Sequence, residues 1–139
     1  MNVHRAEVVH TSILAPRHDV IAFLSDVRRW KTWAPWVRAV ERSSTNEWIV
    51  QTDTGRLTLR FVEPNSLGVL DHVVTLPSGT TLLNSMRVLP NGEGSELVMV
   101  LFQSPPASSE EFERDVQSVR EDLARIKTAA EAPTKEGPR

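Results

Sequence analysis

The fold is decided by residues 108–131, which have the sequence SSEEFERDVQSVREDLARIKTAAE. Apolar residues recur there every three or four positions, and this spacing predicts an amphipathic helix. The apolar stripe consists of Phe112, Val116, Val119, Leu123, Ile126 and Ala130. Ser108 and Glu111 have the spacing of a capping box at the start of the helix. A helix of this length extends about 35 Å and crosses a small domain, so we expect a sheet to cover its stripe.

The residues before this helix show mostly the pattern of strands, with two short helical pieces near the start. A strand is predicted at 6–14, a helix at 16–26, and a second helical piece that carries Trp30 and Trp33 and ends before Pro35. Six strands follow from Val37 onward, and four of them are predicted at 57–61, 67–76, 80–89 and 97–103. Hairpin-length turns make these six strands an antiparallel meander. The predicted fold class is α+β, with a curved seven-stranded antiparallel sheet around a long C-terminal helix and two short helices between the first and second strands.

Composition fits a single domain over residues 1–131, followed by a disordered polar tail at 132–139. The chain has 139 residues, 40% of them hydrophobic, a net charge of −2 and no cysteine. Scattered basic residues give no footprint for nucleic acid, and the lack of cysteine excludes disulfides and thiol catalysis. No apolar segment is long enough for a signal core or a membrane span. We therefore expect a cytoplasmic protein without cofactor or metal.

Several short stretches are similar to the START/SRPBCC superfamily, which has the helix-grip fold. They are ILAP at 13–16 with VIAFLSD at 20–26, WKTWAPWV at 30–37, GVLDH at 68–72, MRV at 86–88 and GSEL at 94–97. The resemblance covers roughly residues 3–131 and includes the birch-pollen-allergen, polyketide cyclase/dehydrase and Hsp90-activator-like groups. It implies a cavity between the long helix and the concave sheet, commonly holding an apolar or amphipathic small molecule such as a lipid. Because such folds host many unrelated activities, the function has to be argued from the lining.

The more apolar set of each strand predicts the side chains that face the cavity. This inward set contains Leu57, Leu59, Phe61, His72, Asn84 and Met86. It leaves Arg60, Asp71 and Arg87 on the outer face, where we expect one charge cluster.

His72 has two interpretations. A histidine in an apolar cavity is a candidate catalytic acid or base, because its unperturbed pKa is near neutrality. The alternative is a buried neutral imidazole that bonds to one neighbour such as Asn84. The second interpretation is favoured, because no carboxylate or nucleophile is evidently placed beside His72. Asn84 would either orient a ligand carbonyl or only satisfy His72.

Trp30, Trp33 and Trp36 are spaced by three residues, so a helix places the first two on one side. Two interpretations stay open: an aromatic wall for a flat or hydrophobic ligand, or packing of a short helix against the sheet. His4, Glu7 and His10 have a spacing that resembles a metal site, but on a strand the glutamate points away from the histidines.

The leading hypothesis is a binding protein for a small hydrophobic or aromatic molecule, held between the 108–131 helix and the sheet. The candidate ligand-binding residues are Trp33, Trp36, Phe61, His72, Asn84, Met86 and Leu123. One alternative is a polyketide cyclase/dehydrase-like enzyme with His72 as the acid-base group. Another is a protein-interaction domain similar to Hsp90-activator modules. The expected partners are the small molecule and no nucleic acid, in a monomer or a homodimer.

Overall fold

The computed structural model describes residues 2–133, which form one sheet and three helical elements. In chain order these are β1 (Ala6–Ile13), α1 (Arg17–Ser25), the 3-10 helix η1 (Val27–Thr32), β2 (Val37–Ser44), β3 (Glu47–Thr52), β4 (Gly55–Phe61), β5 (His72–Thr75), β6 (Thr81–Asn91), β7 (Gly94–Phe102) and α2 (Ser109–Glu131). The predicted polar tail at 132–139 lies outside the described residues from position 134 onward.

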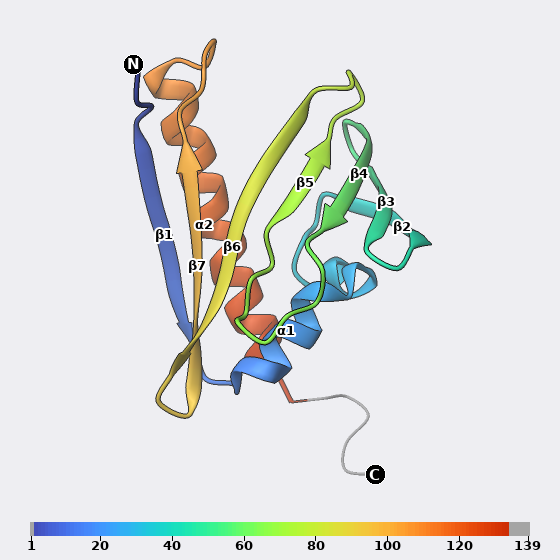
Figure 1. Cartoon of the computed structure of the whole chain (residues 1–139), viewed down its shortest axis with the longest axis vertical. Helices are drawn as coiled ribbons and strands as arrows, with labels where there is room; N and C mark the ends of the chain where they lie inside the picture. Colours follow the sequence, from blue (N-terminus) through green and yellow to red (C-terminus); the bar gives the residue numbers. More distant parts are fainter. Residues whose placement is uncertain (1, 134–139) are drawn as a thin grey trace.

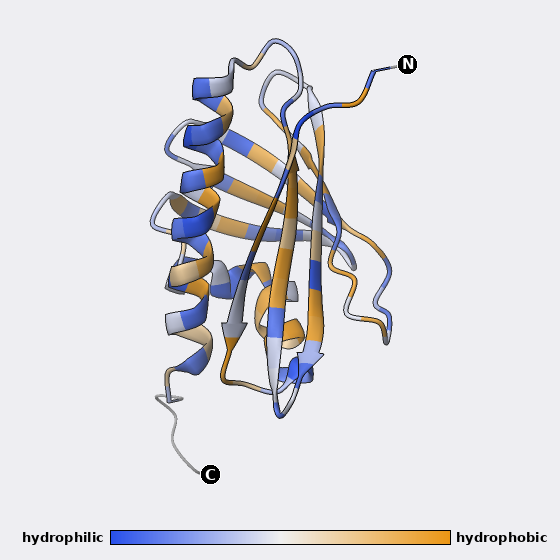
Figure 2. Ribbon diagram, turned by 90° about the vertical axis from the view of Figure 1, so that its left-hand side faces the viewer, coloured by the Kyte–Doolittle hydropathy of each residue, from blue (hydrophilic) through white to orange (hydrophobic). Residues whose placement is uncertain are grey.

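The seven strands form one antiparallel sheet in the order β1-β7-β6-β5-β4-β3-β2. The sheet curves, and α2 runs along its concave side while α1 and η1 lie near one end (Figure 1). In Figure 2 the ribbon of α2 alternates between hydrophilic and hydrophobic residues along its length, as expected for a helix with one covered face. The predicted helix-grip fold is therefore confirmed.

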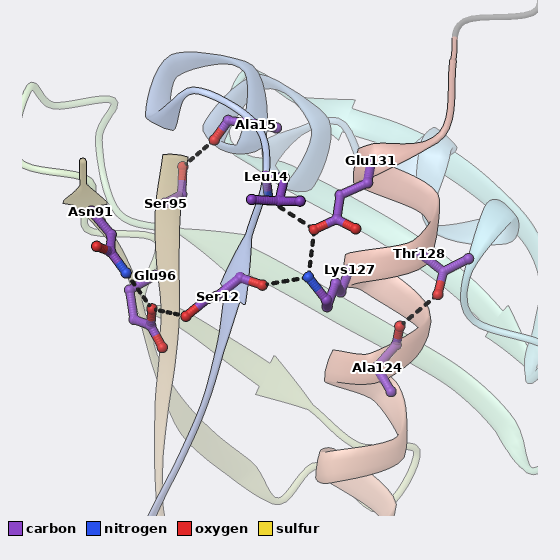
Figure 3. A network of polar contacts seen from close by, with 10 residues as sticks. All are labelled: Ser12, Leu14, Ala15, Asn91, Ser95, Glu96, Ala124, Lys127, Thr128 and Glu131. Carbon is purple, nitrogen blue, oxygen red and sulfur yellow. Dashed lines mark hydrogen bonds and ion pairs between the residues drawn. The ribbon is translucent and has the colours of Figure 1, made fainter. Parts of the chain in front are cut away.

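Local contacts hold both ends of α2. At its start, the Ser108 hydroxyl accepts from the Glu111 amide at 3.1 Å and the Glu111 carboxylate accepts from the Ser108 amide at 3.0 Å, which confirms the capping box. Near its end, the Lys127 ammonium donates to the Ser12 carbonyl at 2.8 Å and Glu131 accepts from the Leu14 amide at 2.7 Å (Figure 3). These bonds fix α2 against the end of β1, so the apolar stripe stays over the sheet.

The predicted strand at 67–76 is wrong in its first half, because regular pairing begins only at His72. The Asn65 side chain accepts from the amides of Leu67 and Val69, which bends the chain before it reaches β6. Gly68 has a φ of +77°, and a Cβ there would lie 2.1 Å from the Val88 carbonyl oxygen. A side chain does not fit this close approach, and the segment lies beside β6 with only an isolated bridge between Val69 and Arg87.

The predicted outer charge cluster is also wrong, because it divides into two separate pairs. Asp71 accepts from Arg87 at 2.9 and 3.0 Å, whereas Arg60 lies 3.7 Å from Glu47. The strand register explains the division, since Arg60 lies directly opposite Glu47 on β3 and Asp71 precedes β5.

Candidate functional site

Five aromatic rings from η1, the turn after it, β4 and β5 meet on the concave side of the sheet. This aromatic cluster consists of Trp30, Trp33, Trp36, Phe61 and His72. The ring centroids of Trp30 lie 5.3 Å from Trp33, 6.4 Å from Trp36, 6.4 Å from Phe61 and 6.1 Å from His72. Phe61 and His72 are direct cross-strand partners with centroids 4.9 Å apart. The spacing of three between the tryptophans and the inward phase of both strands together produce one packed aromatic cluster, in which every ring except that of Trp36 is buried.

His72 is buried and has partners for both of its ring nitrogens. Its Nδ1 lies 2.9 Å from the Leu70 carbonyl oxygen, so this nitrogen carries the proton and donates. Its Nε2 is then the acceptor, and it faces the side-chain amide of Asn84 at 3.4 Å. Burial lowers the pKa of His72, although the bond to Leu70 and the charge of Asp71 oppose this shift. The geometry therefore holds a neutral imidazole with a fixed tautomer.

Trp30 and Trp33 differ in the partner of their indole N–H groups. The Trp30 indole donates to the Leu24 carbonyl at 2.9 Å, which ties η1 to the end of α1. Trp33 is only 7% exposed, and its indole nitrogen is the one buried side-chain polar atom within residues 2–133 that lacks a hydrogen-bond partner. A buried donor without an acceptor destabilises the folded state by about 1–3 kcal/mol. An oxygen atom that accepted a hydrogen bond from the Trp33 indole would remove this cost.

Helix α2 reaches the aromatic cluster through Asp122 and Arg125. The Arg125 guanidinium donates to the Trp33 carbonyl at 3.0 Å and to the Asp122 carboxylate at 2.6 Å. Burial raises the pKa of Asp122, while hydrogen bonds from Arg125 and Trp36 pull it the other way. Sequence reasoning missed these two residues, because the bond from Arg125 to Trp33 joins positions 92 residues apart. Their position on the flank of the apolar stripe was the only available signal.

The structure brings most, but not all, of the predicted site residues together. Trp33, Trp36, Phe61 and His72 belong to the aromatic cluster and Asn84 touches it through His72. Met86 is buried on β6, two residues beyond Asn84 and on the same face of the sheet.

Leu123 lies elsewhere, in a groove between β1 and α2. This groove has a volume of about 540 Å³, and its lining contains Val9, Leu123 and Ala124 together with polar side chains of both elements, such as Thr11 and Lys127. The groove therefore lies between the C-terminal helix and the edge strand of the sheet.

Two further properties concern only residues 2–133. No three histidine or acidic side chains in this part of the chain lie close enough together to hold a metal ion. None of its helices is long and apolar enough to cross a bilayer.

Comparison with known families and structures agrees with this architecture. Residues 5–131 match the family described as polyketide cyclase / dehydrase and lipid transport. The chain belongs to this family. Members of its START/Bet v 1-like superfamily are among the similar solved structures. A search of curated proteins found no match to the sequence of this chain.

Three solved structures illustrate the likeness. A START superfamily protein from Mycobacterium smegmatis has a TM-score of 0.75 at 9% identity, over 93% of this chain and 98% of that one. The Zhui aromatase/cyclase from Streptomyces sp. R1128 has a TM-score of 0.73 at 17% identity, over 99% and 100% of the two chains. Ara h 8.0201 has a TM-score of 0.70 at 11% identity, over 92% and 98%. At these identities the likeness shows a common fold.

Proposed function

We propose that this protein binds a small hydrophobic or aromatic molecule between α2 and the concave face of the sheet, with the aromatic cluster as one wall of the site. The observation that carries the proposal is the buried indole N–H of Trp33, which has no hydrogen-bond partner within residues 2–133. A ligand oxygen that accepts this hydrogen bond relieves the desolvation cost of the buried donor. The family description, which includes lipid transport, supports a ligand of this class.

The groove between β1 and α2 lies at the edge of the same helix–sheet layer, although none of the five rings of the aromatic cluster lines it. Its volume of about 540 Å³ lies within the range of roughly 300–1,000 Å³ that is common for small-molecule sites. Val9, Leu123 and Ala124 lie among polar lining residues, which are His10, Thr11, Arg120, Lys127 and Thr128. This mixed lining favours an amphipathic ligand with both carbon and polar atoms. The proposed ligand is thus a ring system or acyl chain with one carbonyl or hydroxyl oxygen.

The enzyme alternative needs a second ionisable group that converges on His72. Asp71 is the adjacent residue, but its carboxylate bonds to Arg87 and to the Met86 amide instead. The Nε2 of His72, which would act as the base, already faces the Asn84 amide. The geometry therefore supports binding better than acid-base catalysis by His72.

A matched pair of ligands tests the proposal. 1-Tetralone and tetralin have nearly the same shape, but only tetralone carries an acceptor oxygen. We expect the protein to bind tetralone at least fivefold more tightly in calorimetric titration, because only the ketone satisfies Trp33. In Trp33→Phe this preference should disappear, whereas Trp48→Phe should keep it. Failure of both compounds to bind, or an unchanged preference in Trp33→Phe, would overturn the proposal.

A further inference from the structure

A second pocket lies between α1, the β2–β3 turn and the loop at 62–70. Its volume is about 210 Å³, and Ile21, Trp48, Phe61 and Leu70 form its apolar walls. No residue of α2 and neither Trp33 nor Trp36 contributes to its lining. We call it the α1 pocket, and it is separate from the site proposed above although Phe61 belongs to both.

Arg42 is the one charged side chain that lines the α1 pocket. Its Nη2 donates to the Thr45 carbonyl at 2.8 Å and its Nε to the Ser44 carbonyl at 3.2 Å. Its guanidinium also lies 5.2 Å from the ring centroid of Trp48. Three contacts therefore hold this side chain in place at the pocket, which reduces the entropy that a ligand would have to remove.

The charge of Arg42 is not balanced by the protein. No carboxylate lies within 4.0 Å of its guanidinium in the part of the chain that the structure describes, and Nη1 makes no hydrogen bond there. Arg28, the other cation near Trp48, differs because it is bound to Asp26 at 2.9 Å. A guanidinium with open donors is well suited to a carboxylate, which accepts charge-assisted hydrogen bonds.

A neutral polar group lies in the same lining. Asn46 is half-buried, and its backbone carbonyl accepts from the Phe61 amide at 2.9 Å, which fixes the turn. Its side-chain amide makes no hydrogen bond within residues 2–133 and is available to a ligand oxygen. The pocket is therefore amphipathic, with Arg42 and Asn46 as polar groups and Ile21 and Leu70 as apolar ones.

We propose that the α1 pocket binds a small aromatic carboxylic acid, with the carboxylate on Arg42 and the ring against Ile21, Phe61 and Leu70. The volume of about 210 Å³ is below the range of roughly 300–1,000 Å³ for drug-sized ligands, so the pocket suits a compound with a single ring. The absence of Asp and Glu from the lining favours the anion over a neutral analogue.

The test uses phenylacetate and its neutral analogue 2-phenylethanol with the full chain. Binding is followed by calorimetry and by the fluorescence of Trp48, with Trp48→Phe to assign the signal. We expect phenylacetate to bind at least tenfold more tightly than the alcohol, and more weakly as the salt concentration rises. Arg42→Gln should remove this difference. Arg38→Gln, on the same strand but paired with Asp53 outside the pocket lining, is the matched control and should leave it unchanged.

Two further variants separate this pocket from the aromatic cluster. Ile21→Trp fills the α1 pocket and should abolish phenylacetate binding while tetralone still binds. Trp33→Phe should leave phenylacetate binding intact. Thermal melts establish that each variant is folded. The proposal is overturned if phenylacetate does not bind up to millimolar concentration, if Arg42→Gln binds it as well as the wild type, or if Trp33→Phe alone abolishes binding.

Discussion

The surroundings of Trp30 and Trp33 differ although the two indoles are three residues apart and their centroids are separated by only 5.3 Å. The Trp30 side of the aromatic cluster is closed, because its N–H bonds to Leu24 and its ring contacts the strands through Phe61 and His72. The Trp33 side has a buried donor without an acceptor and is fixed to α2 only through its backbone carbonyl. Two similar rings in one cluster thus differ in whether their indole N–H has a hydrogen-bond partner, and the proposed binding role of Trp33 rests on this difference.

The largest expected effect comes from replacing each indole by a phenyl ring. Trp30→Phe removes the indole hydrogen bond to the Leu24 carbonyl and also leaves a cavity. We therefore expect a loss of about 2–3 kcal/mol in the free energy of unfolding. Trp33→Phe leaves a similar cavity but also removes an unsatisfied donor, and should cost about 1 kcal/mol or less. Urea unfolding of both variants measures the difference. Equal losses would mean that the Trp33 N–H is satisfied in solution.

A smaller effect is expected when the link between α2 and Trp33 is cut. Arg125→Gln removes the bond to the Trp33 carbonyl and should cost about 1 kcal/mol of stability. It should also weaken tetralone binding, because the turn that positions the Trp33 indole is less restrained. Arg114→Gln serves as the control, since Arg114 is exposed on the same helix and forms no ion pair within residues 2–133. Loss of stability without any change in tetralone affinity would limit Arg125 to a structural role.

The smallest effect concerns the pH dependence on the Trp30 side. Burial lowers the pKa of His72, so below about pH 6.5 the unfolded state takes up a proton that the folded state resists. Stability should therefore fall as the pH drops, by at most about 0.7 kcal/mol between pH 7 and pH 6. His72→Asn should lack this component when both proteins are unfolded by urea at several pH values. Identical pH profiles would show that His72 titrates normally in the folded state.

The pKa of Asp122, on the α2 side of the cluster, makes stability change with pH in the opposite direction to the pKa of His72. Its raised pKa means that the folded state keeps a proton to higher pH than the unfolded state does. Its contribution to stability is therefore more favourable at low pH and is lost as the pH rises through the folded pKa. Asp122→Asn should remove this component from the acid limb of the profile, which separates the two halves of the aromatic cluster by titration.

Structural features that depend only on residues within one helix or strand could be predicted from the sequence. The period of α2, its capping box and the inward phase of Phe61 and His72 follow from spacings within one element. The segment before His72 was not predictable, because its loop depends on the approach of Gly68 to the backbone of Val88 in another strand. The partner of Arg125 is equally remote, since nothing near position 125 indicates the carbonyl of Trp33.

The same limit applies to the two pockets. The tryptophan spacing left open both an aromatic wall for a ligand and packing of a short helix, and four of the seven predicted site residues lie in the aromatic cluster. The α1 pocket combines side chains from α1, a hairpin turn and a loop, which no periodicity within one segment connects. Arg42 has the pattern of an ordinary strand cation until the turn carbonyls that hold it are known.

The bonds from Lys127 and Glu131 to residues 12 and 14 also determine the order in which the molecule can be completed. They join positions 115 and 117 residues apart, and β1 pairs with β7 over a comparable separation. Contacts this distant in sequence form slowly, because the chain must close a long loop before they add any stability. During synthesis the β2–β6 meander can pair first, while the aromatic cluster stays uncovered until α2 has left the ribosome. The period in which these rings stay uncovered is therefore set by the time at which α2 is made.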